Sequence, residues 1–237
     1  RITGKKDYEK AADRILKWLS TQFNKQEGFF YRGSRFNPET GKWEIDGVYA
    51  TDVNALAIIG LGAEVLNNTD DKKPIFAGRN TVQKILENLD KRAAVRSDGE
   101  IIGYDATDES GRGGRDEAIF PEFSSMVALA KKIAGDTQGA DSILSHLSRL
   151  ARRNKAGVGL PYCSEPYIKP FFDSQWTTPD AQVSIAPTAW FGFGQLGYNP
   201  FSIDSPTPEG LEPKNTFTVI RDEYPTDDFA ANISRGL

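Results

Sequence analysis

The chain has 237 residues, of which 38% are hydrophobic and 26% charged, and its net charge is -4. This acidic balance, with Lys and Arg scattered along the chain, argues against nucleic-acid and membrane-surface binding, because both depend on clustered basic residues. One cysteine and one histidine exclude an intrachain disulfide and a Cys/His metal centre. No apolar run approaches the roughly 20 residues that a membrane span needs.

The first predicted element is an amphipathic helix over residues 5–23. Its apolar side chains, among them Ile15, Trp18 and Leu19, recur at a spacing of three to four, so one face is expected to be buried. Residues 29–45 alternate aromatic residues with Arg and Gly around a Pro-Glu-Thr-Gly turn. We interpret them as a long loop or a small hairpin that is not part of a sheet.

Residues 46–62 (DGVYATDVNALAIIGLG) join a polar, aromatic segment to a helix over 51–66 that is apolar on most faces. A helix of this kind is predicted to be buried. Its N-terminus offers unpaired N–H groups and partial positive charge, which favours a functional site at that end.

The same layout occurs twice more. An amphipathic helix over 75–89 is followed by a polar loop (97–116) and an apolar helix (120–133). A third pair consists of a helix over 139–153, a loop over 157–183 and an apolar helix over 184–196. A period of this size with two helices in each unit predicts a helical-hairpin array.

The predicted fold class is therefore all-α, with about three αα hairpins arranged as half of an (α/α)6 toroid. Residues 1–201 form this part, and residues 202–237 form an extended tail with short strand character at 216–220. Half a ring would leave apolar helices uncovered, so we expect another chain or a missing N-terminal half to complete it. The first residue is Arg1 and not Met, which suggests a processed or truncated product.

The segment YATDVNALAIIGLG, followed by GLPYCSEP and WTTPDAQVSIAPTAWFGFGQLGYNPF, resembles the (α/α) toroid proteins of the six-hairpin glycosidase group. The resemblance covers residues 8–201 and is greatest to the last part of bacterial members. It implies an all-helical toroid that acts on carbohydrate. The group includes hydrolases, lyases and members without an established reaction, and no complete catalytic motif of one family is matched.

Glycoside hydrolysis needs two carboxyl groups, one protonated and one ionised. Asp46 and Glu117 occupy equivalent positions in the first two repeats and are the first candidates for this pair. Asp52, Glu122 and Asp180 are the next catalytic candidates. The alternative is that these carboxylates cap helices, which stabilises a helix by about 1 kcal/mol.

Aromatic residues in the loops are candidates for stacking on sugar rings. The expected substrate-binding residues are Trp43, Tyr49, Trp176, Tyr104, Tyr162 and Arg115. The alternative is that the aromatic rings close the hydrophobic ends of the helical array. Cys163 and His146 are interpreted as a packed thiol and a surface histidine, not as a nucleophilic dyad.

No cofactor is expected, although the acidic residues between Asp98 and Glu117 could hold Ca²⁺. Their spacing differs from an EF-hand, which favours a solvated loop. The leading functional hypothesis is a secreted or extracellular glycoside hydrolase that acts on a polysaccharide or oligosaccharide. The alternatives are a structural or assembly subunit of an extracellular complex, and a polysaccharide lyase that uses Tyr49 near Asp52 and Arg115.

Overall fold

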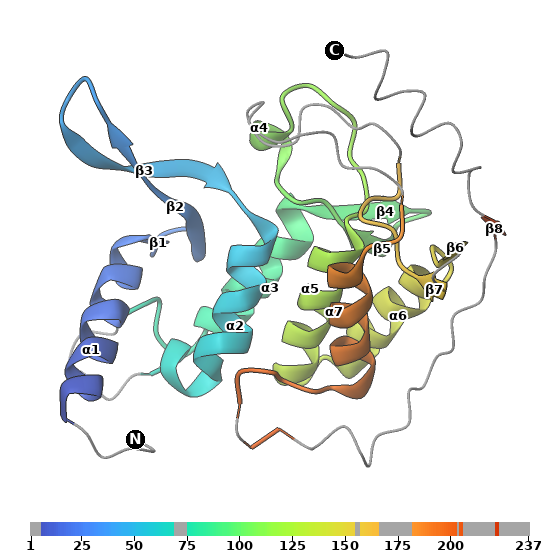
Figure 1. The fold of residues 1–237 in the computed structure, drawn as a ribbon. Helices are drawn as coiled ribbons and strands as arrows, with labels where there is room; N and C mark the ends of the chain where they lie inside the picture. The colour runs from blue at the N-terminus through green and yellow to red at the C-terminus, as the bar shows by residue number, and fades with distance from the viewer. Residues whose placement is uncertain are drawn as a thin grey trace.

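The computed structural model describes residues 6–68, 75–154, 157–165, 182–202, 204–205 and 221–222. Figure 1 shows the helices side by side, with β-hairpins above their upper ends. The helices are α1 (Lys6–Thr21), α2 (Thr51–Leu66), α3 (Thr81–Arg92), α4 (Glu109–Arg112), α5 (Pro121–Ile133), α6 (Thr137–Ser148) and α7 (Ile185–Leu196). The strands are β1 (Phe23–Asn24), β2 (Phe29–Asn37), β3 (Lys42–Tyr49), β4 (Ala94–Ser97), β5 (Glu100–Tyr104), β6 (Arg152–Asn154), β7 (Gly157–Gly159) and β8 (Arg221–Asp222).

Helix α5 is the centre of the core. Ten of its thirteen residues are buried, and it packs against α2, α6 and α7. Pro121 begins the helix, where its missing N–H leaves no extra donor unpaired. Helices α3 and α6 are amphipathic and bury the apolar stripe that their spacing predicts, including Ile85 and Leu144. The predicted contrast between apolar central helices and amphipathic flanking helices is therefore present in α5, α3 and α6.

Helices α2, α5 and α7 begin at the same end of the molecule, where Figure 1 shows the chain entering each of them from above. The predicted start of α2 at residue 51 is confirmed. Helix α7 ends at Gly197, whose φ of 64° lies in the left-handed region that glycine adopts readily. The side chains in the first turns of these three helices therefore lie at one end of the fold.

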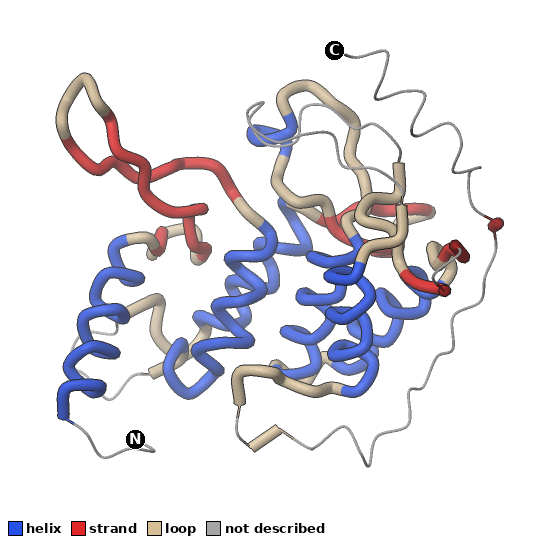
Figure 2. The backbone as a smooth tube through the Cα atoms, viewed as in Figure 1, coloured by secondary structure: helices blue, strands red, loops and turns tan. Residues whose placement is uncertain are grey.

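The prediction of an all-α half toroid is wrong. The described residues form a mixed fold with three small sheets, drawn in red in Figure 2. Their strand orders are β1-β2-β3, β4-β5 and β7-β6-β8, and all neighbouring strands are antiparallel except β6 and β8. The small hairpin that was one interpretation of residues 29–45 is present as β2 and β3, but it belongs to a sheet. The segments 97–116 and 157–183, which were expected to be loops, also supply strands.

Local turn chemistry explains two of these hairpins. Asp98 and Gly99 both have positive φ, at 51° and 84°, and they connect β4 to β5. Asp-Gly at such a position is a strong hairpin signal. Strand β2 pairs with β3 around the Pro-Glu-Thr-Gly turn, and the pairing opposes Gly33 to Asp46 and Phe36 to Trp43.

Helix α1 differs from the prediction in another way. It contains no buried residue, and the side chains of Tyr8, Ile15 and Trp18 are each more than half exposed. Its sequence is amphipathic, but the described part of the chain covers the apolar face only in part: Leu19 packs against the core, whereas Ile15 and Trp18 stay exposed. Among the described helices, none has the length and apolar character that crossing a lipid bilayer requires.

Candidate active site

Two carboxylates occupy equivalent places on neighbouring helices. Asp52 is the second residue of α2, and Glu122 is the second residue of α5. Because the two helices pack against each other and begin at the same end, these first turns bring both side chains to one region. Both carboxylates are partly buried.

The first turn of α2 is held on both sides of Asp52. The Thr51 backbone N–H donates to the Ala106 carbonyl at 3.0 Å, and the Thr51 hydroxyl donates to the Asp105 carbonyl at 2.6 Å. The Asn54 side chain accepts from the Phe30 N–H at 2.8 Å and donates to the Phe30 carbonyl at 3.0 Å. Asp52 therefore projects from a fixed backbone.

The start of α5 is fixed in a similar way. The Phe120 N–H donates to the Tyr104 carbonyl at 2.9 Å, and the Ser124 hydroxyl oxygen accepts from the Tyr104 N–H at 2.8 Å. The segment before the helix is also tied to Ser164. The Ser164 N–H donates to the Ile119 carbonyl at 2.8 Å, while the Ile119 N–H donates to the Ser164 hydroxyl oxygen at 3.0 Å.

Burial raises the pKa of Asp52, and hydrogen bonds from backbone N–H groups together with the Arg32 charge reduce this rise. Burial also raises the pKa of Glu122, and the negative charge of Asp52 raises it further. The two carboxyl groups therefore interact electrostatically. Two carboxyl groups that interact in this way do not titrate independently of each other.

Tyr162 lies beside the carboxylate pair. Burial raises the pKa of its phenol, and the charges of Glu122 and Asp52 raise it further. The Tyr162 ring meets Phe120 edge-to-face, with 6.2 Å between the ring centroids. A neutral phenol next to two carboxyl groups can donate or accept a hydrogen bond when substrate is bound.

Arg32 links the pair to strand β3. Its guanidinium donates to the Asp46 carboxylate from Nε at 2.9 Å and from a terminal nitrogen at 2.6 Å. The same guanidinium is near enough to Asp52 to lower the pKa of that carboxyl. Arg32 was not among the predicted site residues. Predicting the β2–β3 hairpin in its observed register, with Gly33 opposite Asp46, would have placed Arg32 near Asp46.

The structure gives Asp46 and Glu117 separate arginine partners. Asp46 pairs with Arg32, while Glu117 lies 3.7 Å from Arg112 and its side chain is 43% exposed. Asp46 and Glu117 occupy equivalent positions in the sequence repeat, but each pairs with its own arginine and not with the other carboxylate. The carboxylates that do interact are Asp52 and Glu122.

Three predicted substrate-binding residues are buried in the protein. Tyr49 is 1% exposed, its hydroxyl has no hydrogen-bond partner among the described residues, and burial raises its pKa. The Tyr104 hydroxyl donates to Asp90 at 2.5 Å, and burial raises the pKa of that phenol. Arg115 makes two hydrogen bonds of 2.7 Å with the buried carboxylate of Asp105.

The remaining predicted residues lie elsewhere. Trp43 is 72% exposed on β3 and meets Phe36 edge-to-face, with 5.8 Å between the ring centroids. Asp180 and Trp176 lie outside the described residues. Cys163 is fully buried, and burial raises the pKa of its thiol to about 11, which does not suit a nucleophile at neutral pH.

The acidic segment from Asp98 to Glu117 is tied largely to arginines. Asp108 accepts from Arg92 at 3.1 Å, and Asp105 pairs with Arg115. Within the described ranges, no group of three His, Cys, Asp or Glu side chains is arranged to hold a metal ion. A calcium ion in this segment stays a prediction.

No protein-family model matches the chain, and no curated protein or solved structure matches it. The predicted resemblance to the six-hairpin glycosidase group is therefore wrong. The antiparallel sheets do not belong to an all-helical toroid, and no solved toroid structure matches this chain. The activity of the protein must therefore be inferred from the side chains of the candidate site.

Proposed function

We propose that this protein is a glycoside hydrolase that cleaves an oligosaccharide or polysaccharide, with Asp52 and Glu122 as its acid–base pair. The observation that carries the proposal is the pair of interacting carboxyl groups on the first turns of α2 and α5. Glycosidic bond cleavage needs two carboxyl groups in different protonation states. The charge of Asp52 raises the pKa of Glu122, so ionisation of one group disfavours ionisation of the other.

The surroundings suggest which carboxyl takes which role. Burial raises the pKa of Asp52, and the positive charge of Arg32 offsets part of that rise, whereas no comparable positive charge acts on Glu122 among the described residues. We assign Asp52 the role of base or nucleophile. Glu122 faces a negative charge, which favours its protonated form and suits proton donation to the leaving oxygen. Tyr162 would hydrogen-bond a sugar hydroxyl beside them.

The lyase alternative has less support. A tyrosine base needs a phenol that ionises readily, but the pKa values of Tyr49 and Tyr162 are both raised by burial. Tyr49 is also almost completely buried. Lyase action would release an unsaturated product that absorbs ultraviolet light, whereas hydrolysis releases a saturated reducing end.

The test is a reducing-end assay on a panel of polysaccharides and oligosaccharides, comparing the wild-type protein with Asp52→Asn and Glu122→Gln. Each substitution is expected to lower kcat by at least about 100-fold, since a positioned acid or base contributes about 10²–10⁴ to the rate. Glu117→Gln is the matched control, because Glu117 lies five residues before Glu122 and pairs with Arg112. Full activity in both amide variants would overturn the assignment.

A second candidate function is assembly with another protein chain. The observation that favours it is the uncovered apolar face of α1, which carries Ile15 and Trp18. Exposed apolar side chains grouped on one helix face are typical of an interaction surface. We propose this as a property that accompanies the hydrolase function or replaces it if no substrate is found.

A further inference from the structure

Strand β3 is an edge strand whose outer side has no partner strand among the described residues. The sheet order β1-β2-β3 leaves it paired only with β2. At the base of the hairpin, the Tyr49 carbonyl accepts from the Thr107 hydroxyl at 2.6 Å. At the tip, Lys42, Trp43 and Ile45 are exposed, and Figure 1 shows the hairpin reaching away from the helices. An uncovered edge of this kind is a template for a further strand.

One face of the hairpin tip is apolar. Phe36 lies opposite Trp43, and Ser34 lies opposite Ile45, so these four side chains point to the same face. Trp43 is 72% exposed, Phe36 53% and Ile45 47%. A two-stranded hairpin has only marginal stability by itself. An exposed aromatic pair at the tip therefore favours extension of the hairpin by a further strand.

The other face carries charges of both signs. Asn37 lies opposite Lys42, and Arg35 lies opposite Glu44. Glu44 Oε1 accepts from the Asn37 amide at 2.9 Å and from the Thr40 hydroxyl at 3.0 Å. Among the described contacts, Glu44 Oε2 and the Lys42 ammonium have no partner. The edge strand thus presents a positive and a negative group two residues apart on the same face.

These charges complement each other when two copies of β3 pair. A two-fold axis perpendicular to the sheet makes the two strands antiparallel and keeps both apolar faces on one side. With Trp43 at the axis, Lys42 of each copy lies opposite Glu44 of the other, which gives two pairs of opposite charge. Opposite charges on directly facing residues stabilise a pair of strands.

The two neighbouring registers are less favourable. With Glu44 at the axis, the two Glu44 side chains face each other, and Lys42 faces Asp46, whose charge is already offset by Arg32 at 2.6 Å. With Ile45 at the axis, Glu44 faces Asp46 of the second copy. Like charges directly opposite destabilise a pair of strands. Charge therefore specifies the register with Trp43 at the axis.

We propose that two copies of this chain associate through the outer edges of β3, antiparallel and with Trp43 at the two-fold axis. The two hairpins form one four-stranded sheet, and Phe36 and Trp43 of both copies form an aromatic row across it. Pairing at the edge leaves both faces of this sheet open. The proposal uses neither the carboxylate pair nor the α1 face, and it does not depend on the hydrolase function.

The test is disulfide cross-linking of Trp43→Cys. In the proposed register the two introduced thiols lie on directly facing residues, about 4.5–5.5 Å apart between Cα atoms, a separation that a disulfide spans. A mild oxidant should give a dimer on a non-reducing gel. Ile45→Cys is the matched control, because it is exposed on the same face but its two thiols lie about 13 Å apart along the strands. The wild type is the blank, since its single cysteine, Cys163, is fully buried.

Charge variants in the Trp43→Cys background test the register. Lys42→Glu and Glu44→Lys each replace two pairs of opposite charge by two like-charge contacts, so each should slow cross-linking by about tenfold or more. The two substitutions together exchange the charges and should restore the rate. Absence of a Trp43→Cys dimer, an equal or higher rate for Ile45→Cys, or failure of the double substitution to restore the rate would overturn the proposal.

Discussion

Asp52 and Glu122 are carboxyl residues whose partial burial disfavours the ionised form. Both pKa values are raised above the ordinary values of 3.8 and 4.5. A carboxyl group whose pKa is raised by folding binds its proton more tightly in the folded state than in the unfolded chain. Its contribution to stability is therefore present at acid pH and is lost as the pH rises through the folded-state pKa.

Replacing either carboxyl by its amide is accordingly expected to raise the melting temperature at neutral pH. Asp52→Asn and Glu122→Gln should be more stable than the wild type at pH 7, and the difference should shrink as the pH falls below about 4, where the wild-type carboxyls are protonated as well. Thermal unfolding measured across this pH range checks the expectation. Asp46→Asn is the contrasting variant, because it removes the partner of Arg32 and should lower stability at pH 7.

At the scale of elements, Asn54 connects helix α2 to strand β2. Its side chain is completely buried and bonds to the N–H and the carbonyl of Phe30 and to the carbonyl of Ala50. A single amide therefore bonds to backbone groups on both elements, and the Ala50 carbonyl accepts from both the side-chain and the backbone N–H groups of Asn54. This contact joins the hairpin that carries Arg32 to the helix that carries Asp52.

Asn54→Ala is expected to destabilise the fold by about 2–4 kcal/mol, since each buried polar group left without a partner costs about 1–3 kcal/mol. Urea denaturation should show the midpoint moving to lower concentration. Gln83→Ala on α3 is the control, because that amide is exposed and bonds only to Glu87 among the described contacts. A loss as small as that of Gln83→Ala would contradict the connecting role of Asn54.

The β2–β3 hairpin presents the other element-scale prediction. Trp43 and Phe36 form an exposed aromatic pair on it. If the pair stacks on a long sugar chain, Trp43→Ala should raise KM for long oligosaccharides and leave kcat unchanged. Stability should change by about 1 kcal/mol or less, as expected for an exposed aromatic pair. Trp18→Ala, which removes a similarly exposed tryptophan from α1, should leave KM unchanged.

At the scale of the whole molecule, the helices were far more predictable than the strands. The helix from residue 51 to 66 follows directly from its apolar sequence, and the helix from Pro121 differs from the prediction by one residue. Strands β4 to β7 were missed because they contain only three to five residues, too few to show alternation. The longer strands β2 and β3 correspond to the small hairpin that was one interpretation of residues 29–45. Strand β1 consists of two residues and forms only through its pairing with β2.

Asp52 and Glu122, the proposed pair, were both among the candidates selected from the sequence, but their interaction was not predicted. The expectation of a site at the N-termini of the apolar helices led to a candidate set that included Asp52 and Glu122. The repeat offset selected Asp46 and Glu117, because an offset gives equivalent positions and not the distance between side chains. Arg32 was missed because its relation to Asp46 depends on the strand register.

The uncovered face of α1 leads to a prediction for the whole molecule. If another chain covers this face, the protein should associate in a concentration-dependent way, and light scattering should show a mass above that of one chain. Ile15→Glu with Trp18→Glu should abolish the association without lowering monomer stability, because both side chains are more than half exposed. A monomer at all concentrations, with no partner retained, would count against assembly.

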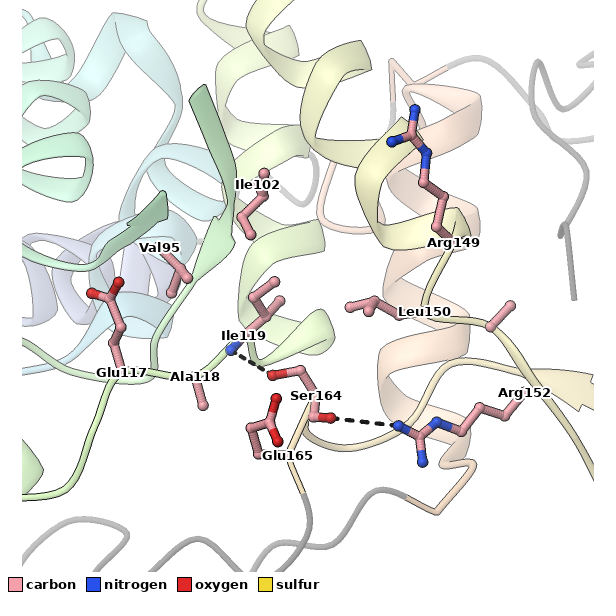
Figure 3. Close-up of a pocket in the computed structure, with 11 residues that line it drawn as sticks. Val95, Ile102, Glu117, Ala118, Ile119, Arg149, Leu150, Arg152, Ser164 and Glu165 are labelled. Carbon is pink, nitrogen blue, oxygen red and sulfur yellow. Dashed lines mark hydrogen bonds between the residues drawn. The ribbon is translucent and has the colours of Figure 1, made fainter. Parts of the chain in front are cut away.

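The two hydrogen bonds between Ser164 and Ile119 have a consequence for local opening of the fold. Each residue supplies the acceptor for the amide of the other, so neither amide can meet solvent unless both segments separate. Tyr162 lies two residues before Ser164, and Glu122 lies three residues after Ile119. Separation of these two segments (Figure 3) would disturb the backbone next to Tyr162 and Glu122, so hydrogen exchange of the two amides is expected to report on the support of the carboxylate pair.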